Sequence, residues 1–137
     1  MSTPATEHLL LIRGTDWDRS LTAEDIDGIM SRFTAWFDGL SQKGLIKSAN
    51  PLYSEGKIVS GKKGQTVADG PFAESKEAIG GYFLLDVAEF AEALQIAREC
   101  PILEFGPVVE VRPVAKQCAL LEFAEARIAQ VNAQARA

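Results

Sequence analysis

The apolar positions near the N-terminus follow two different periods. Residues 8–14, HLLLIRG, form a short apolar run that ends in glycine and predicts a buried strand. Thr22 and Asp25 form a capping-box pattern, after which apolar side chains recur at helical spacing until Lys43 and Gly44, a typical helix end. The predicted apolar face of this helix consists of Ile26, Ile29, Met30, Phe33, Phe37 and Leu40.

Short strand-like runs fill the middle of the chain. Residues 45–56 predict an extended segment, and Pro51 within it indicates an edge or bulged strand because proline lacks a backbone donor. Residues 57–61 and 65–69 predict a hairpin whose strands are joined by Lys-Lys-Gly. Residues 81–87, GYFLLDV, predict a further strand rich in aromatic and aliphatic side chains.

A second helix is predicted after this strand. Asp86 and Glu89 resemble a helix start, and Pro101 ends the helix because its ring prevents continuation. The predicted apolar face of this helix consists of Phe90, Leu94 and Ala97.

The chain closes with a strand and a third helix. Residues 108–114, VVEVRPV, predict a strand. Its alternation places Val109 and Val111 inward, and Glu110 and Arg112 outward. Residues 116–134 predict a C-terminal helix with apolar Leu120, Leu121, Phe123, Ala124, Ile128 and Val131.

The order strand, helix, strands, strand, helix, strand is the ferredoxin-like order. We therefore expect one α+β domain over residues 1–137, with a core at about 7–114, an antiparallel sheet, two helices on one sheet face and an added C-terminal helix. Such a sheet leaves its other face to be covered. We expect a second copy of the chain to cover it, in a homodimer of the dimeric α/β-barrel type. The alternative is that the C-terminal helix covers this face within its own chain.

Composition and charge narrow the class of protein. The 137 residues are 47% hydrophobic and 24% charged, a balance typical of a soluble globular domain. The net charge of −5 and the absence of a basic run beyond Lys62 and Lys63 argue against nucleic-acid binding. Neither a membrane-length apolar run nor a secretory signal pattern is present, so we expect a cytoplasmic protein with free thiols at Cys100 and Cys118. One histidine, His8, and two distant cysteines are too few for a zinc site.

The candidate chemistry is concentrated in residues 66–87, TVADGPFAESKEAIGGYFLLDV. Asp69, Gly70 and Pro71 form a turn signal, in which the Asp69 carboxylate either shapes the turn or faces a pocket as acid, base or ligand. Phe72 either anchors the loop to the core or lines a pocket wall.

Two carboxylates follow in the same loop. Glu74 and Glu77 are three residues apart and would share one side of a helical turn, where they are either solvated or a pair for acid–base work. Together with Asp69 they offer oxygen ligands to a divalent cation, although the spacing matches no EF-hand loop, and we predict no metal site.

Other candidates lie on the predicted strands. The pair Gly80 and Gly81 before Tyr82 predicts a bulge or a close backbone approach. Arg112 either binds an anionic ligand or forms an ion pair with a neighbouring strand, and Arg13 has the same two interpretations. No glycine-rich phosphate loop follows a strand, so we predict no cofactor.

Three segments carry a resemblance to a known family. The stretch DGPFAESKEAIGGYFLLDV, the helix AEFAEALQIARECP and the strand VVEVRPV resemble the DGPF branch of the YCII-related family, and HLLLIRG is similar to its first strand. The resemblance covers residues 7–114. It implies a ferredoxin-like fold, a dimer, a pocket near the DGPF loop, and a regulatory setting beside extracytoplasmic-function sigma factors.

The chain departs from the wider family at one point. Relatives place a histidine on the first helix and an aspartate near the end of the second, as a proposed acid–base pair. Here Phe33 stands near the first place, and Glu99 and Cys100 stand near the second. That pair is therefore not expected in this protein.

Two functions of different classes follow. The first is a homodimeric module that binds a small polar metabolite near the DGPF loop, through Asp69, Gly70, Pro71, Phe72, Tyr82 and Arg112. The second is a cofactor-independent lyase, isomerase or hydrolase whose acid–base groups are Asp69, Glu74 and Glu77. The absence of a nucleophile motif and of a metal cluster in the sequence favours the first.

Overall fold

Four strands and two helices form the core of the protein, as a computed structural model shows. The structure describes residues 6–14, 17, 19–70, 78–116 and 119–136. In chain order the core elements are β1 (His8–Arg13), α1 (Ala23–Gln42), β2 (Ile46–Pro51), β5 (Ile79–Leu85), α2 (Phe90–Arg98) and β6 (Val108–Pro113).

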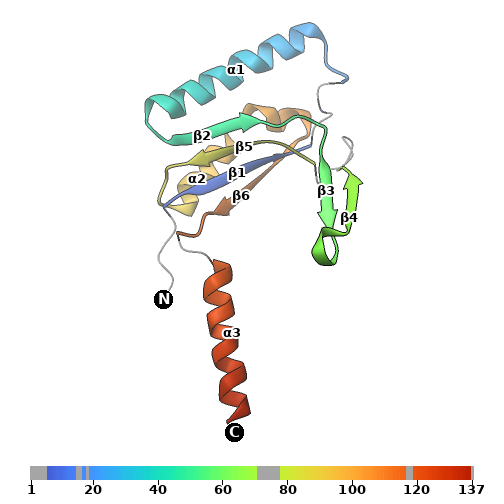
Figure 1. The fold of residues 1–137 in the computed structure, drawn as a ribbon. Coiled ribbons are helices and arrows are strands. Elements are labelled where there is room, and N and C mark those ends of the chain that lie inside the picture. The colour runs from blue at the N-terminus through green and yellow to red at the C-terminus, as the bar shows by residue number, and fades with distance from the viewer. Residues whose placement is uncertain (1–5, 15–16, 18, 71–77, 117–118, 137) are drawn as a thin grey trace.

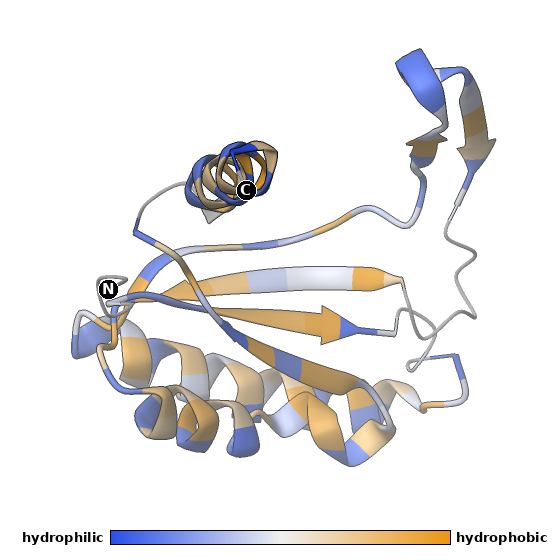
Figure 2. Ribbon diagram, turned by 90° about the horizontal axis from the view of Figure 1, so that it is seen from below, coloured by the Kyte–Doolittle hydropathy of each residue, from blue (hydrophilic) through white to orange (hydrophobic). Residues whose placement is uncertain are grey.

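The four strands form an antiparallel sheet in the order β2-β5-β1-β6. The first strand thus lies between the third and fourth strands of the core, as in a ferredoxin-like fold. Helices α1 and α2 both pack on the same face of the sheet (Figures 1 and 2). The predicted α+β architecture is confirmed.

The buried core lies between this sheet face and the two helices. Along β1 the side chains alternate, so that His8, Leu10 and Ile12 are buried while the residues between them are half-buried. On β5 the buried side chains are Phe83 and Leu85. We call this the helix-covered face of the sheet, and the opposite one the open face.

Helix α1 begins and ends where the sequence predicts. The Thr22 hydroxyl accepts a hydrogen bond from the Asp25 backbone N–H at 3.1 Å, and the Asp25 carboxylate accepts one from the Thr22 N–H at 3.2 Å. Lys43 is the C-cap, and Gly44 follows with a φ of 71°, a conformation that glycine adopts without strain. The predicted capping box and helix end are confirmed.

Helix α2 differs from the prediction in its start and in its face. It begins at Phe90, and neither Asp86 nor Glu89 provides a side-chain cap. The Asp86 backbone N–H instead donates to the Leu45 carbonyl at 2.7 Å. The predicted end before Pro101 is confirmed, because a 3-10 helix, η2 (Pro101–Phe105), starts there.

The apolar face predicted for α2 was wrong at two of its three positions. Phe90 and Leu94 are 47% and 43% exposed, whereas the buried residues of the helix are Ala93, Ile96 and Ala97. A nine-residue helix has fewer than three turns, so its apolar positions define the buried side poorly. The small alanines let α2 lie close to the sheet.

Strand β2 is an edge strand with a register shift between Ile46 and Ser48, and Pro51 is its last residue. Both features agree with the prediction. Beyond it, β3 (Lys57–Ser60) pairs with β4 (Thr66–Asp69) around a short turn, η1 (Lys62–Gly64). This predicted hairpin is confirmed, and it forms a separate two-stranded sheet.

Helix α3 (Ala119–Ala135) extends away from the sheet beyond β6 (Figure 1). Its large apolar side chains are all exposed, from 48% at Val131 to 76% at Leu120. The alternative in which this helix covers the open face of its own chain is therefore wrong. No helix among the described residues has the length and hydropathy required to span a bilayer.

Candidate functional site

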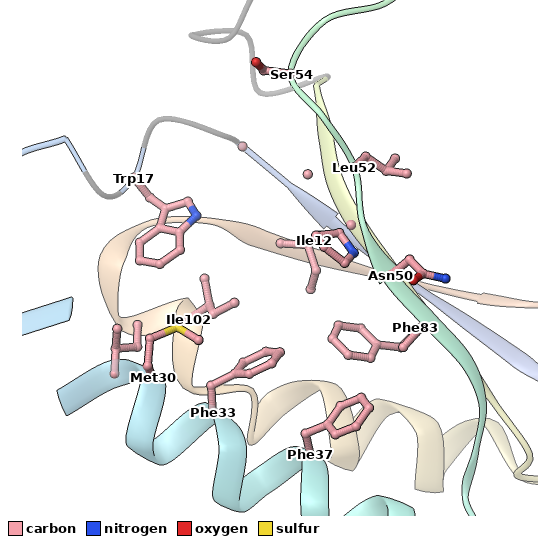
Figure 3. Close-up of a pocket in the computed structure, with 16 residues that line it drawn as sticks. Ile12, Trp17, Met30, Phe33, Phe37, Asn50, Leu52, Ser54, Phe83 and Ile102 are labelled. Carbon is pink, nitrogen blue, oxygen red and sulfur yellow. The ribbon is translucent and has the colours of Figure 1, made fainter. Parts of the chain in front are cut away.

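A cavity of about 530 Å³ lies between α1 and the helix-covered face of the sheet (Figure 3). The helix side includes Met30, Phe33 and Phe37, which lie on successive turns of α1. The opposite wall contains Ile12 of β1 and Phe83 of β5. In addition, η2 contributes Ile102, and the end of β2 contributes Ala49, Asn50 and Pro51. Residues of α1, β1, β2, β5 and η2 therefore meet at this cavity.

Aromatic rings form one end of the cavity. Phe33 and Phe37 stack with centroids 6.4 Å apart, and both contact Phe83, at 6.0 and 6.1 Å. Trp36 meets Phe83 edge-on at 5.3 Å, and thus fixes this ring from the side. Rings in such arrangements attract one another beyond their buried area, so this wall is well defined.

Two adjacent glycines shape the sheet wall. Ile12 pairs with Gly81 and Arg13 with Ile79, so that Gly80 is an extra residue in β5. A Cβ atom on Gly81 would lie 3.2 Å from the Asn50 carbonyl oxygen, which is closer than nine in ten real Cβ contacts. The predicted bulge is confirmed, and the group that approaches closely is β2 of the same chain.

Few polar groups reach the cavity. Asn50 lines it with its backbone, while its side chain points to the open face and donates to the Tyr82 hydroxyl at 3.1 Å (Figure 3). Ser54 lies at the end of the lining that is farthest from α1 (Figure 3). Within the described part of the lining there is no carboxylate, histidine, cysteine, lysine or arginine. The cavity thus favours an apolar or aromatic molecule with few hydrogen-bonding groups.

The DGPF loop begins and ends near this cavity. At one end the Gly14 N–H, beside the cavity, donates to the Ala78 carbonyl at 2.8 Å. At the other end the Gly70 N–H donates to the Gly56 carbonyl at 3.3 Å, two residues after Ser54. The predicted site residues Pro71, Phe72, Glu74 and Glu77 lie outside the described residues, and their roles stay predictions.

The remaining predicted site residues lie away from the cavity. The Asp69 carboxylate forms an ion pair with the Lys57 ammonium across the β3–β4 hairpin, and its side chain is 77% exposed. This geometry agrees with a role of Asp69 in the hairpin. Its predicted role as acid, base or ligand stays untested.

Tyr82 and Arg112 lie on the open face of the sheet. Hydrogen bonds with Ser48, at 3.4 Å, and with Asn50 lower the pKa of the Tyr82 hydroxyl below its ordinary value. Arg112 and Arg13 both pair with Glu110, each at 3.4 Å, and the Arg13 pair crosses from β1 to β6. The contact of Arg13 agrees with the predicted ion pair between neighbouring strands. Arg112 instead pairs with Glu110 of its own strand, β6, and not with a neighbouring strand as predicted.

His8 and Cys100 are part of the buried core. His8 is 2% exposed and its Nδ1 donates to the Val87 carbonyl at 2.9 Å, so it packs within the core of its own chain. Cys100 is 3% exposed, and burial raises the pKa of its thiol, so this side chain packs in the core. Cys118 lies outside the described residues, and among those described no cluster of potential metal ligands occurs.

Residues 11–117 match the YCII-related domain, more than three-quarters of the chain. The chain belongs to the YCII-related family. The finer assignment of this YCII-related protein to the DGPF branch stays a prediction.

Two known proteins are similar to parts of this chain. An uncharacterised protein of Rhizobium meliloti strain 1021 is 51% identical over 37 residues, which is 26% of this chain and 30% of that protein. The chain therefore matches less than a third of that relative. A solved structure of 5-chloro-2-hydroxyhydroquinone dehydrochlorinase from Burkholderia phenoliruptrix AC1100, with bound 2,5-dihydroxybenzoquinone, is 13% identical and has a TM-score of 0.46. The superposition covers 81% of this chain and 95% of the other, and no activity is transferred from it.

The family resemblance implied a pocket near the DGPF loop, but sequence reasoning missed the residues that line the cavity. The missed residues are mainly apolar side chains that the pattern assigned to the core, such as Met30, Phe33 and Phe83. The sequence contained one signal for a cavity. The glycine pair of β5 leaves part of the sheet wall without side chains, opposite four large apolar side chains of α1. A pattern of apolar positions cannot distinguish a filled core from one with a cavity.

Proposed function

We propose that this YCII-related protein binds a small, largely apolar molecule, aromatic in character, in the cavity between α1 and the sheet. The observation that carries this proposal is the cavity itself, about 530 Å³ in volume and lined by the rings of Trp17, Phe33, Phe37 and Phe83. Ligand pockets in proteins commonly have volumes of roughly 300–1,000 Å³ and mainly apolar walls with few polar groups.

This proposal changes the expected polarity of the ligand. A polar metabolite in this cavity would lose hydrogen bonds to water, and each buried polar group without a partner costs about 1–3 kcal/mol. The described lining offers Ser54 and a few backbone groups as partners. A ligand with an aromatic body and one or two polar atoms beside Ser54 fits these surroundings.

Binding is supported better than catalysis. An acid–base enzyme needs a titratable group within hydrogen-bond reach of its substrate. The described lining supplies none, and the Asp69 carboxylate points to solvent beside Lys57. A regulatory role beside a sigma factor, which the family resemblance implies, is compatible with such a binding module and forms part of the proposal.

The test is a thermal-shift screen of small aromatic compounds on three matched variants. Ala49→Leu adds apolar volume to the cavity wall, whereas Ala68→Leu makes the same change at an exposed position of β4. Asp69→Asn removes the carboxylate at the start of the DGPF loop. A compound that binds the folded protein raises its melting temperature by mass action.

We expect one or more compounds to stabilise the wild type, Ala68→Leu and Asp69→Asn, and to leave Ala49→Leu unshifted. An equal shift in Ala49→Leu contradicts the cavity as the binding site. Loss of the shift in Asp69→Asn alone, with its stability unchanged, would instead place the ligand at the DGPF loop.

A further inference from the structure

The open face of the sheet is flanked by two projecting elements. The β3–β4 hairpin and α3 both lie on the open-face side, opposite α1 and α2 (Figure 2). At the centre of the open face, Leu9 pairs with Leu84 and Leu11 pairs with Tyr82. These side chains are half-buried, although no helix covers them in this chain.

The chain exposes far more surface than a compact protein of its size. Its accessible surface is 9920 Å². A compact monomer of 14.8 kDa exposes roughly 7,000 Å², so the excess is about 2,900 Å². A stable dimer buries on the order of 800 Å² on each partner, and obligate dimers bury up to about three times that area. The excess is thus sufficient for a large interface.

Helix α3 presents an apolar stripe to solvent. At 100° per residue, the stripe residues lie within an arc of about 100° around the helix axis; they are Leu120, Leu121, Ala124, Ile128 and Val131. All of these side chains are exposed. Helices in proteins gain most of their stability from packing of their apolar face, and a partner surface would supply this packing to α3.

We infer that α3 is a dimerisation arm, whose apolar stripe packs on a second copy of this chain, against the open face of its sheet. The helix projects past β6 and does not fold back on its own sheet (Figure 1). A twofold axis places each α3 on the other chain, so that both uncovered surfaces are buried by one interaction. The arm begins at Ala119, beyond the family match over 11–117, and is thus an addition to the YCII-related domain.

A second copy explains the arrangement better than an unrelated partner. The same chain has an uncovered apolar sheet face and an uncovered apolar helix stripe. Sheet faces in proteins are commonly covered by helices, so these two surfaces can bury each other. An unrelated partner would have to supply both a helix for the sheet and a surface for α3. The inference is independent of the ligand cavity, which lies on the other side of the sheet.

The test compares two substitutions of alanine by glutamate on α3. Ala124→Glu places a charge in the stripe, and Ala126→Glu places the same charge on the opposite side of the helix. Light scattering of the full chain over a dilution series gives the dimer dissociation constant. We expect the wild type and Ala126→Glu to form dimers of twice 14.8 kDa, and Ala124→Glu to dissociate at least about tenfold more readily, because its charge is buried without a partner.

Hydrogen exchange on the wild type provides a second measurement that needs no variant. The α3 amides and those of β1 and β6 should exchange slowly in the dimer, and α3 should lose protection on dilution to the monomer. A wild type that stays monomeric overturns the inference. So does a dimer that Ala124→Glu does not weaken relative to Ala126→Glu, or one in which α3 exchanges without protection.

Discussion

The two faces of the sheet contain similar apolar residues but differ in what covers them. On the helix-covered face, Leu10 and Leu85 are completely buried under α1 and α2. Their neighbours Leu9, Leu11 and Leu84 point the other way and remain half-buried. An apolar strand therefore does not show that both of its faces are packed within one chain.

The faces also differ in their polar groups. The open face carries the Tyr82 hydroxyl with its hydrogen bonds and the ion pairs of Glu110 with two arginines. The helix-covered face encloses the cavity, whose described lining contains no charged side chain. Charged side chains suit a wet rim between two copies, whereas an uncharged cavity suits a ligand that leaves water.

The largest expected effect compares adjacent residues of β5. Leu85→Ala should lower the free energy of unfolding by about 2–5 kcal/mol, because it leaves a hole in the packed core. Leu84→Ala removes the same atoms from the open face and should cost less than half as much in the monomer. Urea unfolding of dilute samples measures both. Equal losses would show that the faces are packed alike.

A second comparison uses glycine to alanine at two positions. Gly81→Ala forces a methyl group against the β2 backbone and should lower stability by about 1–3 kcal/mol. Gly28 lies within α1 with open space around it, so Gly28→Ala should raise stability by about 0.5–1 kcal/mol. Thermal unfolding checks both signs, and a stabilised Gly81→Ala would contradict the close approach of β2 to β5.

The elements were predictable from the sequence because their signals are local. The capping box at Thr22, the glycine after Lys43 and the proline that ends β2 each act within a few residues. The buried side of α2 was predicted wrongly because so short a helix is oriented by its neighbours. The cavity and the direction of α3 depend on contacts between distant segments, or on their absence, and no local pattern contains that information.

In the candidate site, too, local features were predictable from the sequence and features that depend on distant contacts were not. The glycine pair in β5 was predictable as a bulge, and the loop before it was found as the most unusual stretch of the sequence. The polar side chains that suggested chemistry, such as Tyr82 and Arg112, lie on the face opposite the cavity. Strand alternation alone does not show which face will hold a ligand, since that depends on where the helices pack.

The buried thiol of Cys100 gives a pH dependence. Burial raises its pKa above the ordinary value of 9.0, so at higher pH the unfolded chain loses the thiol proton before the folded chain does. The unfolded state then binds fewer protons, and the free energy of unfolding falls as the pH rises above about 9. Cys100→Ala should show a shallower fall in urea unfolding over this pH range. An identical slope would contradict the burial of the thiol.

The smallest effect is expected at the exposed hairpin. The Lys57 and Asp69 side chains are 66% and 77% exposed, and solvent screens their ion pair. Asp69→Asn should therefore change the free energy of unfolding by less than about 1 kcal/mol. A larger loss in thermal unfolding would show that Asp69 has a role beyond this pair.

The central claim is that one face of the sheet holds a ligand and the other a second copy of the chain. Methyl NMR tests it in a single sample, with 1-naphthol as the aromatic probe and with dilution as the second variable. We expect 1-naphthol to shift the methyl signals of Ile12, Ile29 and Ile102, and dilution to shift those of Leu9, Leu11 and Leu84. The account is contradicted if the probe shifts the open-face leucines and leaves the cavity isoleucines unchanged.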